Sequence, residues 1–150
     1  MKKIYMIFIS FIFVLMLSAC TTSLSYTFTV ENGDNIKVKL DTSGGYKLSQ
    51  EGSEFCVSKD GVELTRGFFM TEEKYTSYFD NVEGAKGVSH FDSGTYNGNE
   101  YIYYQYEEDG TDTWYHVIIV EDSSTGVALS NTNGSDSAEE IFELLSFTKE

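Results

Sequence analysis

The sequences YIYYQY at residues 101–106 and WYHVIIV at residues 114–120 decide how this chain is expected to fold. Both runs are rich in aromatic and β-branched residues, which are favoured in strands. We expect an antiparallel hairpin in which Tyr106 lies opposite Trp114, and both of its faces are then apolar. Because an antiparallel sheet that is exposed on one side has a polar face, the hairpin is predicted to lie inside the sheet, covered on both sides.

Alternating hydrophobic residues predict further strands on both sides of this hairpin. Asn32-Gly33-Asp34 and Asp60-Gly61 are turn sequences, so the runs that flank each of them predict two more hairpins. In the second hairpin, a two-residue turn places Val57 opposite Leu64. The expected strands outside the 101–120 hairpin lie at 26–30, 36–40, 46–48, 55–59, 62–70 and 127–129.

Two segments have hydrophobic residues at helical spacing. The first covers residues 72–83, with Thr71 in position to cap it, and the second covers residues 137–147. Asp136 and Glu139 have the spacing of a capping box. The order β-strands–α–β-strands–α therefore predicts an α+β domain, in which an antiparallel β-sheet is packed with two main helices.

The same segments resemble the PsbP-like fold, which is shared by the extrinsic photosystem II subunit, a Ran-binding nuclear import factor and many small bacterial lipoproteins. The resemblance rests on Gly45-Tyr46, the helix 72–83, Tyr96-Asn97-Gly98 and the terminal AEEIFELLSF at 138–147. It implies that residues 26–150 form a single PsbP-like α+β domain. Because proteins of one fold differ widely in function, it implies no particular activity.

The first 19 residues have the composition of a secretory signal peptide. Lys2 and Lys3 precede the uncharged run Ile4 to Ala19. This run is shorter than the ~20 apolar residues that a membrane-spanning helix needs. We therefore expect residues 1–19 to be cleaved off.

Leu17-Ser18-Ala19-Cys20 resembles the bacterial lipobox. The resemblance implies cleavage between Ala19 and Cys20 and transfer of a diacylglyceryl group to the Cys20 sulfur. Residues 20–25 are then the lipidated N-terminus and a short tether. The lipid bilayer is the partner of acylated Cys20, and the domain lies at the extracytoplasmic face of a bacterial cell membrane. The alternative is an ordinary signal peptide with an accidental cysteine.

The expected mature chain is strongly acidic. Without Lys2 and Lys3 it has eight basic and 24 acidic side chains, a formal charge of −16. Nucleic acid binding requires clustered Lys and Arg that neutralise phosphates, so we expect no nucleic acid partner. The charge also opposes contact of the folded part with an anionic membrane surface.

No catalytic residue, cofactor site or metal site is expected. Cys56 lies between Phe55 and Val57 in an expected strand, so we expect it to be a small buried hydrophobic residue. His90 and His116 have no nucleophile or metal-ligand motif around them. Residues 129–140 resemble a calcium loop, but Leu129 stands where the first carboxylate belongs. The chain is therefore expected not to be an enzyme.

Tyr106, Trp114 and His116 are the candidate residues for a binding patch, because they lie near one end of the aromatic hairpin. Three functions follow, in order of preference. The first is a non-catalytic binding or adaptor domain of an envelope lipoprotein, with an envelope protein or a glycan as partner. The second is a ligand-binding module for a glycan, a peptide or a metal ion, and the third is a small enzyme.

Replacing the lipobox cysteine tests the anchor. The Cys20→Ala variant is expected to lose incorporation of labelled fatty acid, because it has no thiol that can form the thioether. Metabolic labelling followed by gel electrophoresis measures this. Equal labelling of the variant and the wild-type protein contradicts the lipobox interpretation.

Overall fold

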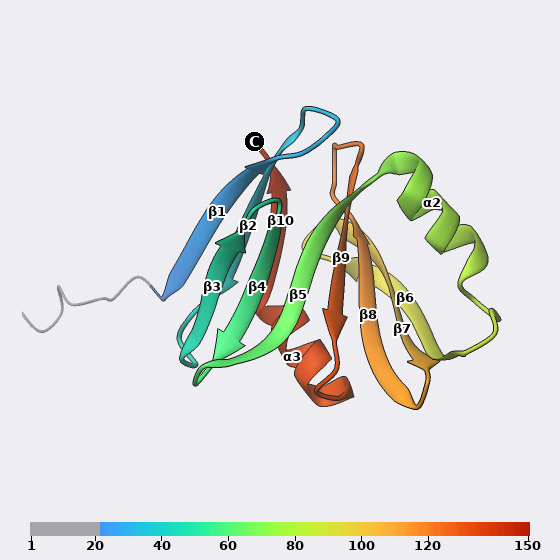
Figure 1. The fold of residues 1–150 in the computed structure, drawn as a ribbon. Coiled ribbons are helices and arrows are strands. Elements are labelled where there is room, and N and C mark those ends of the chain that lie inside the picture. Colours follow the sequence, from blue (N-terminus) through green and yellow to red (C-terminus); the bar gives the residue numbers. More distant parts are fainter. Residues whose placement is uncertain (1–21) are drawn as a thin grey trace, which may run out of the picture.

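The computed structural model describes residues 22–150, most of which form strands (Figure 1). Within this range the chain forms, in order, β1 (Ser23–Thr29), β2 (Asn35–Asp41), β3 (Tyr46–Glu51), β4 (Glu54–Lys59), β5 (Val62–Thr71), α2 (Glu72–Asn81), β6 (Val88–Tyr96), β7 (Asn99–Glu108), β8 (Thr111–Ile119), β9 (Thr125–Asn131), α3 (Ser135–Leu144) and β10 (Leu145–Lys149). Neither helix within residues 22–150 is long and apolar enough to cross a membrane.

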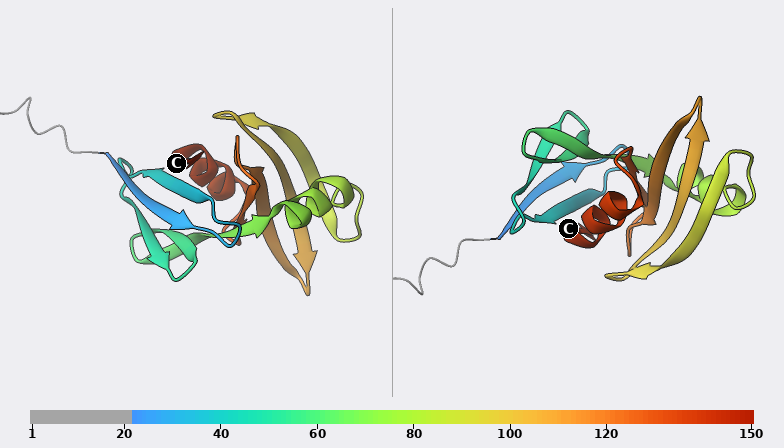
Figure 2. Two further views of the ribbon diagram at one scale, coloured as in Figure 1. Left: turned by 90° about the horizontal axis from the view of Figure 1, so that it is seen from above. Right: turned by 90° about the horizontal axis from the view of Figure 1, so that it is seen from below.

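The strands form two antiparallel sheets. The small sheet has the order β1-β2-β10, and the large sheet has the order β3-β4-β5-β9-β8-β7-β6. The small sheet and α3 pack against one face of the large sheet, whereas α2 packs against the other face (Figure 2). The large sheet is therefore covered on both faces at its central strands.

The predicted α+β arrangement is wrong. Strands make up 59% of the described residues and helices 16%, so the fold is β-rich, with two sheets packed on each other. The sequence analysis missed two strands. The residues of β6 are mostly exposed and lack a buried, alternating face. Residues 145–147 were assigned to the end of the last helix, but residues 145–149 form β10, which pairs with β2.

The predicted signal peptide (1–19) and Cys20 lie outside the described residues. β1 begins at Ser23, within the segment 20–25 that the sequence analysis assigned to a tether. The strand Tyr26–Val30, the hairpin around Asn32-Gly33-Asp34 and the strand at Tyr46 are present where the sequence predicts them. The predicted capping box is wrong, because α3 begins at Ser135 and its N-cap residue is Gly134.

The hairpin formed by β7 and β8 lies inside the large sheet, as predicted, between β6 and β9. Its predicted register is wrong by one residue, because Tyr106 pairs with Thr113 and Trp114 pairs with Gln105. The cause is the two-residue turn Asp109-Gly110, whose residues have φ angles of 51° and 78°. Such turns match the twist of the flanking strands, so the strands continue through the segment that was expected to be a loop.

The β4–β5 hairpin also differs from its predicted register. Val57 pairs with Thr65 instead of Leu64, because the register shifts between Val57 and Ser58. A bulge of this kind inserts one unpaired residue into a strand. Cys56 then lies opposite Arg66, on the face of the sheet that points away from the main core.

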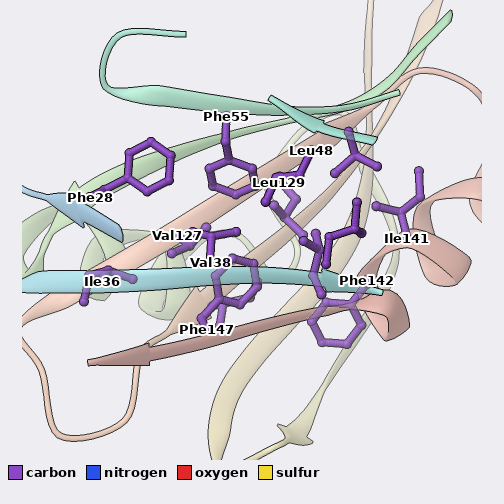
Figure 3. Packing of buried hydrophobic residues seen from close by; sticks show 14 of the residues in the cluster. Phe28, Ile36, Val38, Leu48, Phe55, Val127, Leu129, Ile141, Phe142 and Phe147 are labelled. Carbon is purple, nitrogen blue, oxygen red and sulfur yellow. The ribbon is translucent and has the colours of Figure 1, made fainter. Parts of the chain in front are cut away.

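Aromatic rings join the two sheets. The Phe55 ring on β4 lies 5.9 Å from the Phe28 ring on β1 and 6.1 Å from the Phe147 ring on β10 (Figure 3). It also lies 5.9 Å from the Phe69 ring on β5. Phe55 is fully buried, and the burial of such rings is a main source of stability in small domains.

Asn99 provides a polar link between the sheets. This residue is buried, and its side-chain amide donates a hydrogen bond of 3.0 Å to the backbone oxygen of Phe147. Its side-chain oxygen accepts a hydrogen bond of 2.8 Å from the backbone N–H of Glu121. Both ends of a buried amide are thus satisfied, as stability requires.

Substitution of Gly67 tests the packing between the sheets. A Cβ atom at this position would lie 2.0 Å from the Phe55 ring, so Gly67→Ala is expected to lower the free energy of unfolding by about 3 kcal/mol. Chemical denaturation measures the change. In the double variant Gly67→Ala/Phe55→Leu the smaller side chain leaves room for the new methyl group. The double variant should therefore lose less stability than the two single variants lose together. Simple additivity contradicts the proposed contact.

Candidate functional site

A groove of about 690 Å³ lies where α3 meets the strands β6, β7 and β8. We refer to it as the aromatic groove, because rings line most of it. The volume is within the range of small-molecule sites. The lining residues are His90, Phe91, Asp92, Tyr96, Tyr101, Tyr103, Trp114, His116, Ser135, Glu139, Phe142 and Glu143.

Five of these rings form a continuous row across the sheet. The His116 ring stacks on Phe142, at a centroid distance of 4.2 Å, and on Tyr103, at 4.4 Å. Tyr103 stacks in turn on Trp114, at 5.3 Å, and Trp114 lies 5.5 Å from His90. Residues on paired strands have side chains within reach of one another on the same face, so the pairing of Tyr103 with His116 and of Gln105 with Trp114 produces this row.

An irregularity in β6 brings His90 to the row. The pairing of β6 with β7 shifts between Ser89 and Asp92, and His90 has a φ angle of 51°. His is one of the few residue types other than glycine that adopt this conformation with some frequency. Bulges of this kind redirect side chains and often lie beside functional sites. Here the bulge places both His90 and Asp92 in the groove lining.

Helix α3 forms one wall of the groove and is held by contacts at several points. Ile141 and Phe142 are buried in the core. The Tyr46 hydroxyl donates a hydrogen bond of 2.5 Å to the Glu140 carboxylate, and this bond, with burial, raises the pKa of Tyr46 to about 12. The Tyr96 hydroxyl donates a hydrogen bond of 2.9 Å to the backbone oxygen of Glu143. Tyr46 and Tyr96 lie on β3 and β6, the two edge strands of the large sheet, so the wall is fixed relative to that sheet.

His116 lies at the floor of the groove and is neutral in the folded protein. Its side chain is 3% exposed. Burial lowers the pKa of His116 to about 3, because the charged imidazolium loses its hydration there. At neutral pH it therefore acts as a flat, uncharged ring.

Tyr103 has the one buried side-chain polar atom in residues 22–150 that lacks a hydrogen-bond partner, its hydroxyl oxygen. The side chain is 8% exposed. Burial raises the pKa of this hydroxyl well above its usual value. The Glu139 carboxylate is not placed to form a hydrogen bond with it, but lies near enough to raise the pKa further, both as a charge and as a weak acceptor, so the hydroxyl stays protonated. An unsatisfied buried polar group is costly, and a ligand that hydrogen-bonds to this group removes the cost.

The charged side chains that line the groove all have the same sign. Asp92, Glu139 and Glu143 are exposed. Among the described residues that line the groove, none is Lys or Arg. The groove therefore combines apolar ring surface with negative charge.

The structure places two of the three predicted patch residues together. Trp114 and His116 line the aromatic groove. Tyr106 packs on the opposite face of the sheet, in the cluster that includes Val82 and Tyr75. The one-residue error in register explains the separation, because neighbouring residues along a strand point to opposite faces. Tyr103, His90 and Glu139 were missed, and the Asp109-Gly110 turn was the sequence signal that could have placed Tyr103.

The expected role of His116 also changes. The predicted pairing of Tyr106 with Trp114 would put Tyr104 opposite His116, but Tyr104 stacks on Tyr115, at 5.4 Å, on the α2 side of the sheet. The ring beside His116 is that of Tyr103. The contact between His116 and Tyr103 therefore lies in the aromatic groove and not in the hydrophobic cluster on the α2 side of the sheet.

Cys56 and the acidic segments show no sign of a second site. The Cys56 thiol is buried, and burial, with a hydrogen bond to Glu63, raises its pKa to about 11. A thiol of this kind is unreactive. Residues 129–140 contain the end of β9 and the start of α3 instead of a calcium loop. Within residues 22–150, no group of three or more His, Cys, Asp or Glu side chains is arranged to hold a metal ion.

A larger hollow of about 900 Å³ lies between the end of β1, the β3–β4 turn and the β5–α2 junction. Its lining includes Phe68 and Lys74, and the Lys74 ammonium lies 5.9 Å from the centre of the Phe68 ring. In the part of the chain that the structure describes, no unpartnered buried polar atom lies in this hollow. The aromatic groove is therefore the stronger candidate.

Comparisons with known proteins assign no family. No protein-family model matches the chain, and no curated protein matches it. A search of solved structures finds a protein of Bacteroides thetaiotaomicron VPI-5482, with 16% sequence identity and a TM-score of 0.44. The match covers 75% of this chain and 46% of that protein, so this chain spans less than half of its length. These comparisons test neither the lipobox nor the PsbP-like resemblance.

The burial of His116 predicts a specific pH dependence of stability. Below a pH of about 6.5 the unfolded chain binds a proton at this residue, whereas the folded protein does so only near pH 3. The free energy of unfolding should therefore decrease as the pH is lowered through this window, by up to about 1.4 kcal/mol per pH unit. Denaturation of the wild-type protein and of His116→Phe at several pH values measures the effect. The variant should show a shallower decline between about pH 6 and pH 4, and equal slopes contradict the assignment.

Proposed function

We propose that this protein is a lipid-anchored, non-catalytic binding domain of the bacterial cell envelope, and that it holds its ligand in the aromatic groove. The observation that carries the proposal is the row of rings with Tyr103 at its centre, because the hydroxyl of this tyrosine is buried and has no hydrogen-bond partner. A core made only for packing has no use for an unsatisfied polar group. Violations of this kind are expected at functional sites.

The composition of the groove supports ligand binding. Aromatic rings offer a large contact area at a small cost in conformational entropy, and a few polar groups then orient the ligand. Trp114 is half-buried, so part of its ring surface remains accessible. Of the functions considered from the sequence, a binding module therefore agrees best with this geometry.

The chemistry of the site favours binding over catalysis. The Ser89 hydroxyl donates a hydrogen bond to the Gln105 side chain, at 3.2 Å, and not to a histidine. His116 has a pKa of about 3, far below the pH at which a general base is effective. The groove is thus suited to holding a ligand and poorly suited to transferring its protons.

The proposed anchor rests on the sequence of residues 17–20. Acylation of Cys20 holds the domain close to the membrane, because β1 begins three residues after this cysteine. The lipobox resemblance implies the extracytoplasmic face. The partner is then a component of the envelope or of the surrounding medium. A surface glycan, a peptide and a neighbouring envelope protein are the classes that we consider.

Trp114 allows a direct test of ligand binding, because it is the only tryptophan in the chain. Full-length protein in a polyoxyethylene detergent, which contains neither sugar nor ammonium groups, is titrated with oligosaccharides, short peptides and small amines. We expect at least one class to produce a saturable change in tryptophan emission, matched by heat in isothermal titration calorimetry.

Two variants locate the binding. His90→Ala should weaken it, because this ring covers one side of Trp114. Tyr106→Phe, on the opposite face of the sheet, should leave it unchanged. A panel without saturable binding by either method, or equal effects of the two variants, contradicts the proposal.

A further inference from the structure

The charge of the aromatic groove restricts the ligands that fit it. Asp92, Glu139 and Glu143 contribute three carboxylates, and none of the described lining residues is Lys or Arg. The formal charge of the full chain is −14. A field of this sign attracts cations and repels phosphates and carboxylates. An anionic ligand is therefore excluded.

The unpartnered hydroxyl adds a second requirement. Because the Tyr103 oxygen is buried and accepts no hydrogen bond, it is suited to an N–H donor that arrives with the ligand. Glu139 lies close enough to raise the pKa of Tyr103. A cation that binds Glu139 therefore also lies near the Tyr103 oxygen. A quaternary ammonium group has no N–H and leaves this oxygen unsatisfied.

The shape of the groove adds a third requirement. The rings of Tyr103, Trp114 and His116 lie nearly parallel, with interplanar angles of 24° for each neighbouring pair. The faces of Tyr103 and His116 are occupied by this stacking, so a flat ligand group extends the row by stacking on the accessible part of the Trp114 ring. Guanidinium is planar, is weakly hydrated, stacks on aromatic rings and binds carboxylates through two parallel N–H donors. A compact, strongly hydrated ammonium meets only the charge requirement.

We propose that the aromatic groove recognises a guanidinium group, as presented by an arginine side chain of a peptide or protein, through Glu139, Tyr103 and the neighbouring rings. This inference rests on the proposed binding function and specifies its ligand class. Asp92 and Glu143 provide the surrounding negative charge. Arginine-bearing partners thus bind with their side chain in the groove.

A matched pair of small ligands tests the inference. N-acetyl-arginine amide and N-acetyl-citrulline amide have nearly the same shape, but only the first carries a positive charge. Both are titrated into the full-length protein in the polyoxyethylene detergent, with Trp114 emission and calorimetry as readouts. We expect the arginine derivative to bind at least about tenfold more tightly, since charge-assisted hydrogen bonds exceed neutral ones. Its affinity should fall as salt is added.

Three variants assign the contacts. Glu139→Gln removes a charge from an exposed side chain and should reduce arginine affinity about tenfold, with little effect on citrulline. Glu107→Gln is the matched control, because Glu107 is also exposed and lies outside the groove lining. Tyr103→Phe should reduce arginine affinity several-fold while its thermal stability is unchanged or higher, because the variant removes an unsatisfied group.

The outcomes separate this inference from the proposed function. Equal binding of arginine and citrulline derivatives overturns the inference, while the binding function stands. Binding of an oligosaccharide with no binding of either derivative also overturns the inference and leaves the binding function standing. Absence of binding across all ligand classes overturns both. Equal losses from Glu139→Gln and Glu107→Gln show only a general effect of charge and also overturn the inference.

Discussion

The register of β7 against β8 is the constraint on which the groove depends. The Asp109-Gly110 turn fixes this register, because both residues adopt positive φ angles that few other residue pairs tolerate. Tyr103 and Trp114 then point to the side of the sheet that α3 covers, together with His116. A slip of one residue in β7 would turn Tyr103 toward α2 and separate it from Trp114 and His116 on β8. The two residues of this turn thus determine the composition of a site that begins four residues away.

The sequence predicted the local features of this fold well. Asp60-Gly61 and Asn97-Gly98 both form tight turns with positive φ angles, as expected from the preference of Asn, Asp and Gly for this conformation. The hydrophobic alternation at 26–30 and 36–40 predicted β1 and β2. The helix at 72–81 followed from the spacing of its apolar residues. Each of these signals acts over a few residues.

The long-range features were not predictable in the same way. The pairing of β10 with β2 joins segments about a hundred residues apart, and no local pattern specifies such a contact. Leu145 and Phe147 alternate as strand residues do, but they follow directly after the apolar stripe of α3. β6 is an edge strand with few buried residues, so it lacks the pattern by which strands are identified. β6 forms one side of the groove, which explains why only part of the lining was identified.

The groove shows how a β-rich core can contain a binding site. Stacked rings fill the space between α3 and the sheet, as a core requires. All of these rings except Phe142 also carry polar atoms, and Tyr103 keeps its hydroxyl without a partner. The carboxylates of Asp92 and Glu139 border the same space. The stacked rings, the carboxylates and the unpartnered Tyr103 hydroxyl thus lie in one groove. We infer that the ligand contacts all three.

Intermolecular nuclear Overhauser effects give the most direct test of this account. The experiment uses the full-length protein labelled with ¹³C and ¹⁵N, in detergent, with unlabelled N-acetyl-arginine amide. The account predicts effects between the arginine side-chain protons and the rings of Trp114, His90 and Tyr103. Effects to Tyr104 or Tyr106, on the α2 side of the sheet, would contradict it.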